Sequence, residues 1–249
     1  MEPITIILQL CYITKFMVVA RKVLEEKIKS VGGVEHAMPI APFSMPPEEI
    51  EWRLKDDDVI PDVLPRSPTY PINVSYGPGI RANFGNDLEP DEVKKAPMRV
   101  AWPIIRGRNY TLILTGADDP SAGNPMNREF LQWLVVDIAG CDLAVLKGRT
   151  LCEYVPLQMP PDTGIHRYVF TVYEQPDVKP EWREPIIHKY DDKHRLNFSN
   201  QKFAKKYNLG DAYAANYFTS QHIPPDDDGP GVSAYDKGIL KPDFGWGRT

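Results

Sequence analysis

Three runs of apolar residues in the middle of the chain are separated by loops rich in Pro, Gly and Asp. They lie within residues 110–115, 127–138 and 160–175 and are rich in Val, Ile, Leu, Tyr and Phe. Apolar runs bounded by turn residues are typical of β-strands that are buried on at least one face. The pattern therefore predicts three strands of one core sheet.

Two shorter segments predict further strands ahead of this core. Residues 72–76 alternate apolar and polar side chains, as a half-exposed strand does, and the Gly-Pro-Gly sequence at residues 77–79 predicts a turn after them. Residues 97–102 form another short segment of strand-like composition. Both segments are expected to build the scaffold of the fold.

Three segments have the features of helices. Residues 18–29 carry apolar side chains at helical spacing and charges of both signs on the other face, which predicts an amphipathic helix packed on the domain. Residues 46–55 begin with two prolines and two glutamates, as a helix N-terminus does, with Ser44 as the nearest capping residue. Ser199 or Asn200 can cap a third helix.

The first twenty residues leave the compartment of the chain open between two interpretations. Residues 3–20 are mostly apolar, but Lys15 leaves an unbroken run that is too short to span a bilayer, so no membrane span is predicted. The segment could be a secretory signal, although Glu2 stands where a positive charge is expected, or an extension ahead of a start at Met17. A cytoplasmic protein is the first prediction and a secreted protein is the alternative. Secretion is favoured by three Asn-x-Ser/Thr sequons, at Asn73, Asn109 and Asn197.

Composition argues against a nucleic-acid-binding protein. The 249 residues are 42% hydrophobic and 25% charged, which suits one globular domain with extensions at both ends. The 25 prolines are twice the usual ~5% and favour a loop-rich, all-β chain. A formal net charge of −5, without a stripe of Lys and Arg, is the opposite of what binding to a polyanion requires. The three cysteines lack CxxC spacing and are expected to be reduced thiols.

The sequence lacks the motifs of common catalytic and cofactor sites. It contains no G-x-S-x-G motif and no Gly-rich phosphate-binding loop. His188, Asp191, Asp192 and His194 could imitate a metal cluster, but their spacing matches no known site, and a solvated run of charges is the preferred interpretation. No catalytic residue, metal ion or cofactor is therefore predicted.

The order of motifs along the chain resembles the phosphatidylethanolamine-binding protein family, which includes the Raf kinase inhibitor protein. The motifs are Y-T-L-x-L-T, D-P-S, R-E-x-x-x-W-L-V-V-x-I and G-x-H-R-Y-V-F-x-V-Y-E-Q, and the match extends over about residues 59–222. The resemblance implies an all-β sandwich with few peripheral helices, in which a large antiparallel sheet packs on a smaller one. It also implies an N-terminal extension at residues 1–57, a domain at residues 58–223 and a Pro-, Gly- and Asp-rich tail at residues 224–249.

The resemblance also implies a ligand-binding site. His166 and Tyr168 match the family's H-R-Y motif and, being two apart on a strand, project from the same face. Tyr hydroxyl, backbone N–H and imidazolium groups can all donate hydrogen bonds to phosphate oxygens. The other residues implied at the site are the prolines that rim it, an aromatic, a loop carboxylate and an amide: Pro120, Pro160, Pro161, Phe130, Asp118 and Gln132.

Several positions depart from the family's pattern. The family's D-P-D-x-P loop begins with a pocket carboxylate, but the corresponding residue here is Gly116. Asp118 matches the second Asp and is expected to hold the loop by accepting backbone N–H bonds. Gln132 stands where the family usually has a His, and only Tyr235 is a candidate for the Tyr of the family's C-terminal helix. The loss of the carboxylate at Gly116 is expected to weaken the preference for a zwitterionic headgroup more than that for a simple anion.

The resemblance implies a binding or regulatory protein and not an enzyme. Its ligand would be a phospholipid headgroup or another small anion, its protein partner a kinase or a protease, and the chain is expected to be a monomer. Two alternatives stay open. One is a scaffold with a degenerate pocket, like the related protein of the mitochondrial ribosome, and the other is a hydrolase that uses His166.

Overall fold

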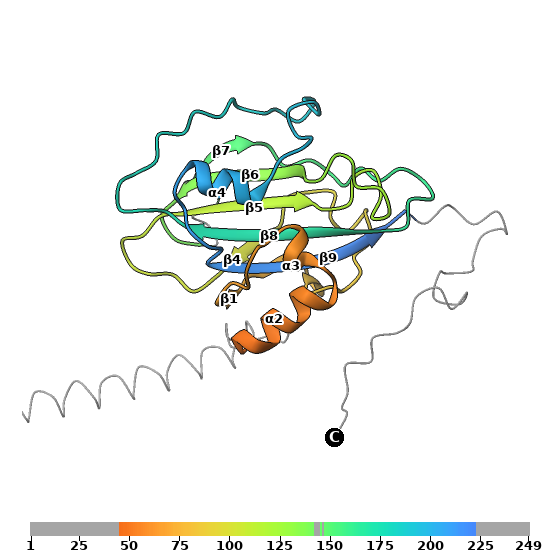
Figure 1. Cartoon of the computed structure of the whole chain (residues 1–249), viewed down its shortest axis with the longest axis horizontal. Coiled ribbons are helices and arrows are strands. Elements are labelled where there is room, and N and C mark those ends of the chain that lie inside the picture. The colour runs from red at the N-terminus through yellow and green to blue at the C-terminus, as the bar shows by residue number, and fades with distance from the viewer. Residues whose placement is uncertain (1–44, 142–144, 146, 223–249) are drawn as a thin grey trace, which may run out of the picture. The chain divides into compact units, whose positions relative to one another are not determined.

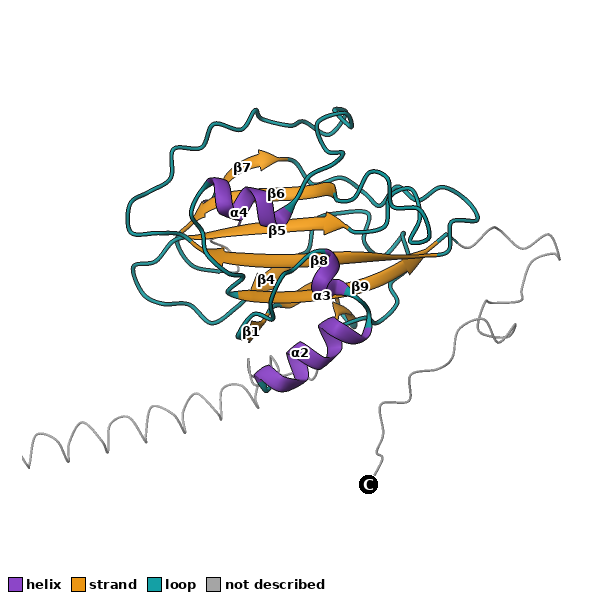
Figure 2. Cartoon of the chain, in the orientation of Figure 1, coloured by secondary structure: helices purple, strands orange, loops and turns teal. Residues whose placement is uncertain are grey.

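The computed structural model describes residues 45–141, 145 and 147–222 of the chain (Figure 1). The apolar segment at residues 3–20, the helix predicted at residues 18–29 and the tail from residue 224 lie outside these residues. The described part contains two β-sheets, with three helices beside the larger one (Figure 2). Among its helices, none is long and apolar enough to cross a membrane.

The large sheet has six strands and contains the three strands predicted from the apolar runs. All neighbouring strands pair antiparallel except β1 and β9, which are parallel. Every residue of the central strand β5 is buried, because both faces of the sheet are covered. In spatial order the strands are β1 (Tyr70–Pro71), β9 (Ala214–Gln221), β8 (Ile165–Glu174), β5 (Tyr110–Gly116), β6 (Phe130–Ile138) and β7 (Arg149–Cys152).

The small sheet has three antiparallel strands in the order β3, β2, β4. The central strand β2 (Asn73–Gly77) alternates buried and half-buried residues, as predicted for residues 72–76. It pairs with β4 (Arg99–Ala101), which lies within the segment predicted at residues 97–102, and with β3 (Ile80–Ala82). The short strands β1, β3 and β7 and the longer strand β9 were not predicted from the apolar and polar pattern.

Three helices lie along the large sheet (Figure 1). Helix α2 (Pro47–Asp56) has Pro46 at its N-cap without a side-chain cap, and the expected capping residue Ser44 lies outside the described residues. A short helical turn, α3 (Val59–Asp62), follows it. Helix α4 (Asn200–Lys206) is capped as predicted, because the Ser199 side chain accepts a hydrogen bond from the backbone N–H of Lys202.

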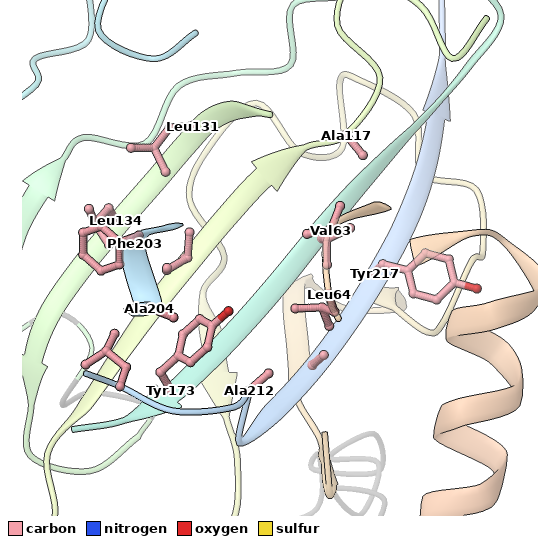
Figure 3. Packing of buried hydrophobic residues seen from close by; sticks show 14 of the residues in the cluster. Val63, Leu64, Ala117, Leu131, Leu134, Tyr173, Phe203, Ala204, Ala212 and Tyr217 are labelled. Atoms are coloured by element: carbon pink, nitrogen blue, oxygen red, sulfur yellow. The ribbon is translucent and has the colours of Figure 1, made fainter. Parts of the chain in front are cut away.

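Hydrophobic side chains form one core on each face of the large sheet. The first lies between the sheet and the helices and includes Ile50, Val59 and Phe203 from α2, α3 and α4. Figure 3 shows part of this core, including Phe203 and Tyr173. The second lies between the two sheets and includes Val74 and Phe218. The predicted sandwich, a large sheet packed on a smaller one with few peripheral helices, is confirmed.

Helix α2 belongs to this domain, although the sequence placed it in the N-terminal extension. Ile50 and Leu54 on its inner face are completely buried in the core beneath the large sheet. The compact unit that contains the sheets begins at Phe43. The boundary predicted at residues 57 and 58 therefore moves toward the N-terminus, so that the domain includes α2.

Gly148, just before β7, is expected to tolerate no side chain. A Cβ at this position would lie 2.6 Å from Val135 Cγ1 and 2.9 Å from the backbone oxygen of Val136, and a backbone atom has little freedom to move away. Gly148→Ala should therefore lower the free energy of unfolding in urea by about 1–3 kcal/mol. Gly123→Ala is the matched control, since nothing lies within 4 Å of its added Cβ. Equal stability of the two variants would contradict the prediction.

Candidate functional site

The candidate site lies at the end of the large sheet where β8 begins and β5 ends. Register places Phe130, Gly116, Tyr168 and Phe218 opposite one another on the adjacent strands β6, β5, β8 and β9. Directly opposed residues project from the same face of a sheet, so these four form one row on the face that packs on the small sheet. Tyr168 stacks on Phe218 with 5.3 Å between the ring centroids.

Gly116 contributes no side chain to this row, and the ring of Tyr168 lies close to it. A Cβ at Gly116 would lie 3.2 Å from Tyr168 Cε1, which is tighter than an ordinary van der Waals contact. The space for a side chain at position 116, where the family has a carboxylate, is therefore reduced by the Tyr168 ring. A Gly116→Asp substitution could not restore the carboxylate without displacing Tyr168.

Gln132 reaches this face because strand β6 contains a bulge. Leu114 pairs with Trp133 and Thr115 pairs with Leu131, so Gln132 is the extra residue between them. A bulge re-aims the side chains around it, and Gln132 Nε2 lies 3.9 Å from the Cβ position of Gly116. The side chain is 2% exposed, and its Oε1 has no hydrogen-bond partner among the described residues.

Arg195 holds the backbone of this bulge in place through hydrogen bonds. Its buried guanidinium donates hydrogen bonds to the backbone oxygens of Leu131 (3.0 Å) and Gln132 (3.3 Å). The same nitrogen lies 2.9 Å from the Cys152 sulfur, and burial raises the pKa of that thiol to about 12. Cys152 is therefore a protonated structural thiol.

His166 is held by a short hydrogen-bond relay. Its Nε2 lies 2.7 Å from Thr163 Oγ1, and the Thr163 hydroxyl donates to the backbone oxygen of Pro160 at 2.7 Å. A hydroxyl has one proton to donate, so the second contact requires His166 Nε2 to carry a proton and donate to Thr163. The relay thereby fixes the tautomer of the neutral ring and ties the Pro160 loop to β8.

The environment keeps His166 and Tyr168 uncharged near neutral pH. Burial lowers the pKa of His166 below its ordinary value of 6.5, and the negative charges of Asp118 and Asp119 oppose this shift without cancelling it. Burial raises the pKa of the Tyr168 hydroxyl, and the same two carboxylates raise it further. Tyr168 therefore stays protonated and can donate a hydrogen bond.

Asp118 holds the loop after β5, as predicted. Its carboxylate accepts a hydrogen bond from the backbone N–H of Arg167 at 2.8 Å and lies in ion pairs with the side chains of Arg167 and Arg128. Asp62 joins both arginines at 2.8 Å. Because the Asp118 side chain is completely buried and both its oxygens accept hydrogen bonds, we assign it a positioning role beneath the site and not a contact with the ligand.

The remaining predicted residues lie around this centre at different depths. Phe130 is 7% exposed and ends the aromatic row, opposite Gly116. Pro120 is half-buried in the loop after β5, next to Asp119, whose charge acts on His166. Pro160 and Pro161 are exposed, and only Pro160 is tied to His166, through Thr163. Their contact with a ligand stays a prediction.

Sequence reasoning missed several residues that support the site. Thr163 and Ser220 are the two beside His166: Thr163 bonds its ring, and Ser220 lies directly opposite it on β9. Ser220 is completely buried, and its Oγ has no partner among the described residues. The Thr three residues ahead of His166 in P-x-x-T-x-x-H was the only readable signal, because cross-strand neighbours such as Ser220 cannot be identified before the register is known.

A second concave region lies at the far end of β8. This shallow depression has a volume of about 480 Å³ and is lined by residues that include Arg108, Glu174, Asp177 and Tyr213. Arg108 is paired with both Glu174 and Asp177, so its charge is already balanced. Elsewhere in the described part of the chain, no group of three His, Cys, Asp or Glu side chains could hold a metal ion. The His166 end of the sheet, where several polar groups lie on one face, is therefore a better candidate for a binding site than this depression.

Comparison with known proteins agrees with this architecture. A solved structure of a carboxypeptidase Y inhibitor complexed with its cognate proteinase superposes with a TM-score of 0.59, at 21% sequence identity, and covers 71% of this chain and 96% of the inhibitor. A similarity at this level of identity concerns the fold alone.

Sequence comparison identifies the family. A putative odorant-binding protein, A5, of Drosophila melanogaster is 33% identical over 174 residues, which are 70% of this chain and 81% of that protein. A 26 kDa secreted antigen of Toxocara canis is 34% identical over 165 residues, which are 66% of this chain but only 61% of the antigen. The family model for phosphatidylethanolamine-binding protein matches residues 87–218. The chain therefore belongs to the phosphatidylethanolamine-binding protein family.

Proposed function

We propose that the chain is a non-catalytic binding protein whose site takes the phosphoryl group of a phospholipid headgroup or of another small phosphate. The observation that carries this proposal is that His166, Tyr168 and the Gln132 amide lie on one face of the sheet, at the end where β8 begins. All three are buried, and each can donate a hydrogen bond to a phosphate oxygen. The Drosophila relative is by its name a putative odorant-binding protein.

Protonation of His166 is expected to strengthen anion binding. The neutral ring already uses its Nε2 proton toward Thr163, so donation from Nδ1 to an anion requires the imidazolium. Because burial lowers the pKa of His166, the imidazolium is scarce at pH 7.5, and an anion gains a charge-assisted hydrogen bond only as the pH falls. Binding of dimethyl phosphate, which keeps one negative charge across this range, should strengthen about tenfold from pH 7.5 to pH 5.5.

Calorimetric titration of the full chain at several pH values would measure this dependence. His166→Gln is the matched variant, because an amide can still bond Thr163 but does not titrate. The affinity of this variant should not change with pH. Glu129, whose pKa is also shifted, is present in both proteins and therefore cannot cause a difference between them. Equal pH dependence in the two proteins would rule out His166 as the anion partner. A lack of binding at millimolar dimethyl phosphate would instead favour the scaffold with a degenerate pocket.

Binding without turnover is part of this proposal. Ser220 is the hydroxyl directly opposite His166, but its Oγ makes no hydrogen bond to the ring or to any other described residue, so no base is placed to activate it as a nucleophile. We expect no release of product from carboxyl or phosphate esters. Turnover that is lost in His166→Gln would overturn this part of the proposal and revive the hydrolase.

For protein partners, we propose the classes that the family resemblance implies, a protein kinase or a proteinase. The proteinase is the class to test first, because the structural neighbour is by its name a proteinase inhibitor, although the similarity to it concerns the fold alone. Inhibition of carboxypeptidase Y by the full chain would be the first assay. Full proteinase activity at micromolar concentrations of the chain would leave the kinase as the class to test.

For the compartment, we retain the cytoplasm as the proposal, although the Toxocara relative is by its name secreted. The sequon at Asn197 separates the two compartments, because this residue is exposed, whereas Asn73 and Asn109 are half-buried. An N-glycan at Asn197 on the protein isolated from its native cells would show passage through the secretory pathway and overturn the proposal. An unmodified Asn197 is the expected result.

A further inference from the structure

We propose that the site selects phosphate esters that carry hydroxyl groups, such as glycerol phosphate, over esters that carry an amine. The inference rests on the proposed phosphoryl-binding function and names the ligand class of the same site. It follows from what surrounds His166 and Tyr168. The nearby acceptors that are left without partners are neutral, and the buried carboxylate is already neutralised.

No carboxylate in the buried row of the site is free to balance an ammonium group. Gly116 offers no side chain, and both oxygens of Asp118 are taken by Arg167 and Arg128. Asp119 is half-buried in the loop, and one of its oxygens accepts a hydrogen bond from Asn127 Nδ2 at 2.8 Å. A cation that left water for this row would therefore lose hydration without gaining an ion pair in the buried part of the site.

Gln132 supplies a neutral acceptor that needs a donor. Its Oε1 is buried without a partner among the described residues, while its Nε2 lies 3.9 Å from the Cβ position of Gly116. A buried unsatisfied carbonyl carries a free-energy cost that a hydroxyl donor removes. The terminal torsion of Gln is broad and twofold, so rotation can turn either the oxygen or the NH₂ group toward a ligand. One side chain can thus serve a hydroxyl and a phosphate oxygen.

Ser220 supplies a second neutral group on the other side of His166. It is completely buried, lies directly opposite His166 in the register and therefore projects from the same face. Its Oγ has no partner within the described part of the chain. A hydroxyl both donates and accepts, so it pairs with another hydroxyl without a net charge. Uncharged groups that lack partners thus lie on both sides of the His166 and Tyr168 pair.

Three phosphate monoesters test the inference on the full chain at pH 7.5: methyl phosphate, glycerol 3-phosphate and phosphorylethanolamine. Methyl phosphate reports the phosphoryl group alone. We expect glycerol 3-phosphate to bind about tenfold more tightly than phosphorylethanolamine by calorimetry, which is the usual size of one added hydrogen bond to a buried partner. NMR shifts of the His166 ring would place the binding at this site.

Substitution of Gln132 tests the assignment of the acceptor. Gln132→Glu keeps the size of the side chain but adds the charge that an ammonium needs, so the preference should reverse toward phosphorylethanolamine. Gln132→Leu should bind the two esters with equal affinity. It is the variant to use if Gln132→Glu does not fold. Thr171→Val is the matched control, because it removes another buried hydroxyl without a partner, from the opposite face of β8, and should leave the preference unchanged.

The outcomes separate the inference from the function on which it rests. Failure of all three esters to bind would overturn the phosphoryl site itself. Binding of methyl phosphate with equal affinities for the two larger esters would leave the function standing and overturn the inference. An unchanged preference in both Gln132→Glu and Gln132→Leu would show that Gln132 is not the acceptor that selects between them.

Discussion

Replacing Asp118 by Ala is expected to lower the free energy of unfolding by about 3 kcal/mol. The Asp118 side chain is completely buried, and it is paired with Arg167 at 2.6 Å and with Arg128 at 3.1 Å. Without it, two arginines that are mostly buried share the single carboxylate of Asp62. Removal of one partner from a buried ion pair costs far more than the pair contributes, because the remaining charge has lost its hydration.

Urea unfolding at pH 7 would measure this loss, with Asp177→Ala as the matched control. Asp177 is also paired with an arginine, but its side chain is 85% exposed, so its removal should change stability by less than about 1 kcal/mol. Similar losses for the two variants would contradict the assignment of Asp118 as the buried centre of the network. A large loss confined to Asp118→Ala would support it.

The same network predicts a loss of stability in acid. Burial alone would raise the pKa of Asp118, but the hydrogen bonds and charges of Arg167 and Arg128 outweigh it and hold the pKa below the ordinary value of 3.8. The stability that the ionised carboxylate contributes is therefore complete above about pH 3.8 and is lost as the pH falls through the lower folded-state value. Asp118→Ala should be missing this part of the acid transition.

The three long strands at the centre of the large sheet could be predicted because their apolar runs are long. Strands β5, β6 and β8 have seven to ten residues, and their apolar runs are bounded by turn residues. Strands β1, β3 and β7 have only two to four residues, which is too short for a periodic pattern to stand out from a loop. They exist because a long neighbour offers free backbone groups, and this is a property of the assembled sheet.

The candidate site could be predicted only in part, because some of its contacts depend on how the strands pair. His166 and Tyr168 lie two apart on a strand, so their common face follows from the sequence alone. The orientation of Gln132 depends on a bulge, which becomes visible only when the partners of Leu114 and Thr115 are known. Ser220 faces His166 across two strands that are more than fifty residues apart in the sequence. Contacts made by register are therefore the part that the sequence did not reveal.

Helix α2 shows how charge can hide a core element. Six of its ten residues are charged, and only Ile50 and Leu54 are buried, so the segment resembles a surface extension. Two buried aliphatic side chains four residues apart are nevertheless enough to seat one helix face on a sheet. Tyr217 on β9 adds a hydrogen bond to the backbone oxygen of Arg53 at 2.9 Å. These few contacts make α2 part of the domain and not of the N-terminal extension.

Glu129 is expected to make the protein less stable as the pH rises from 5 to 8. Its carboxyl group is buried at the start of β6, where it accepts hydrogen bonds from the backbone and side-chain nitrogens of Asn200 and from Thr115 Oγ1, at 2.5–2.8 Å. It thereby connects the first residue of α4 to β5. Burial raises the pKa of Glu129 from 4.5 to about 7, against the opposing effect of these hydrogen bonds and of Arg128.

The sign follows from the protons bound in each state. Between pH 4.5 and about pH 7 the folded state keeps the Glu129 proton and the unfolded state releases it, so rising pH favours unfolding. A shift of this size corresponds to a loss of about 3 kcal/mol once the pH exceeds the folded-state value. The loss is complete near pH 8, because the carboxyl group is then ionised in both states.

The test compares urea unfolding of the wild-type chain and of Glu129→Gln at each half unit of pH from 5 to 8. The difference between the two proteins isolates Glu129, because the other titratable groups, including His166 with its lowered pKa, are present in both. That difference should change by about 3 kcal/mol across the range, whatever the absolute stability of the variant. A difference that stays constant would mean that the three hydrogen bonds to Glu129 hold it ionised throughout. Its pKa would then be ordinary, and the link between α4 and β5 would not respond to pH.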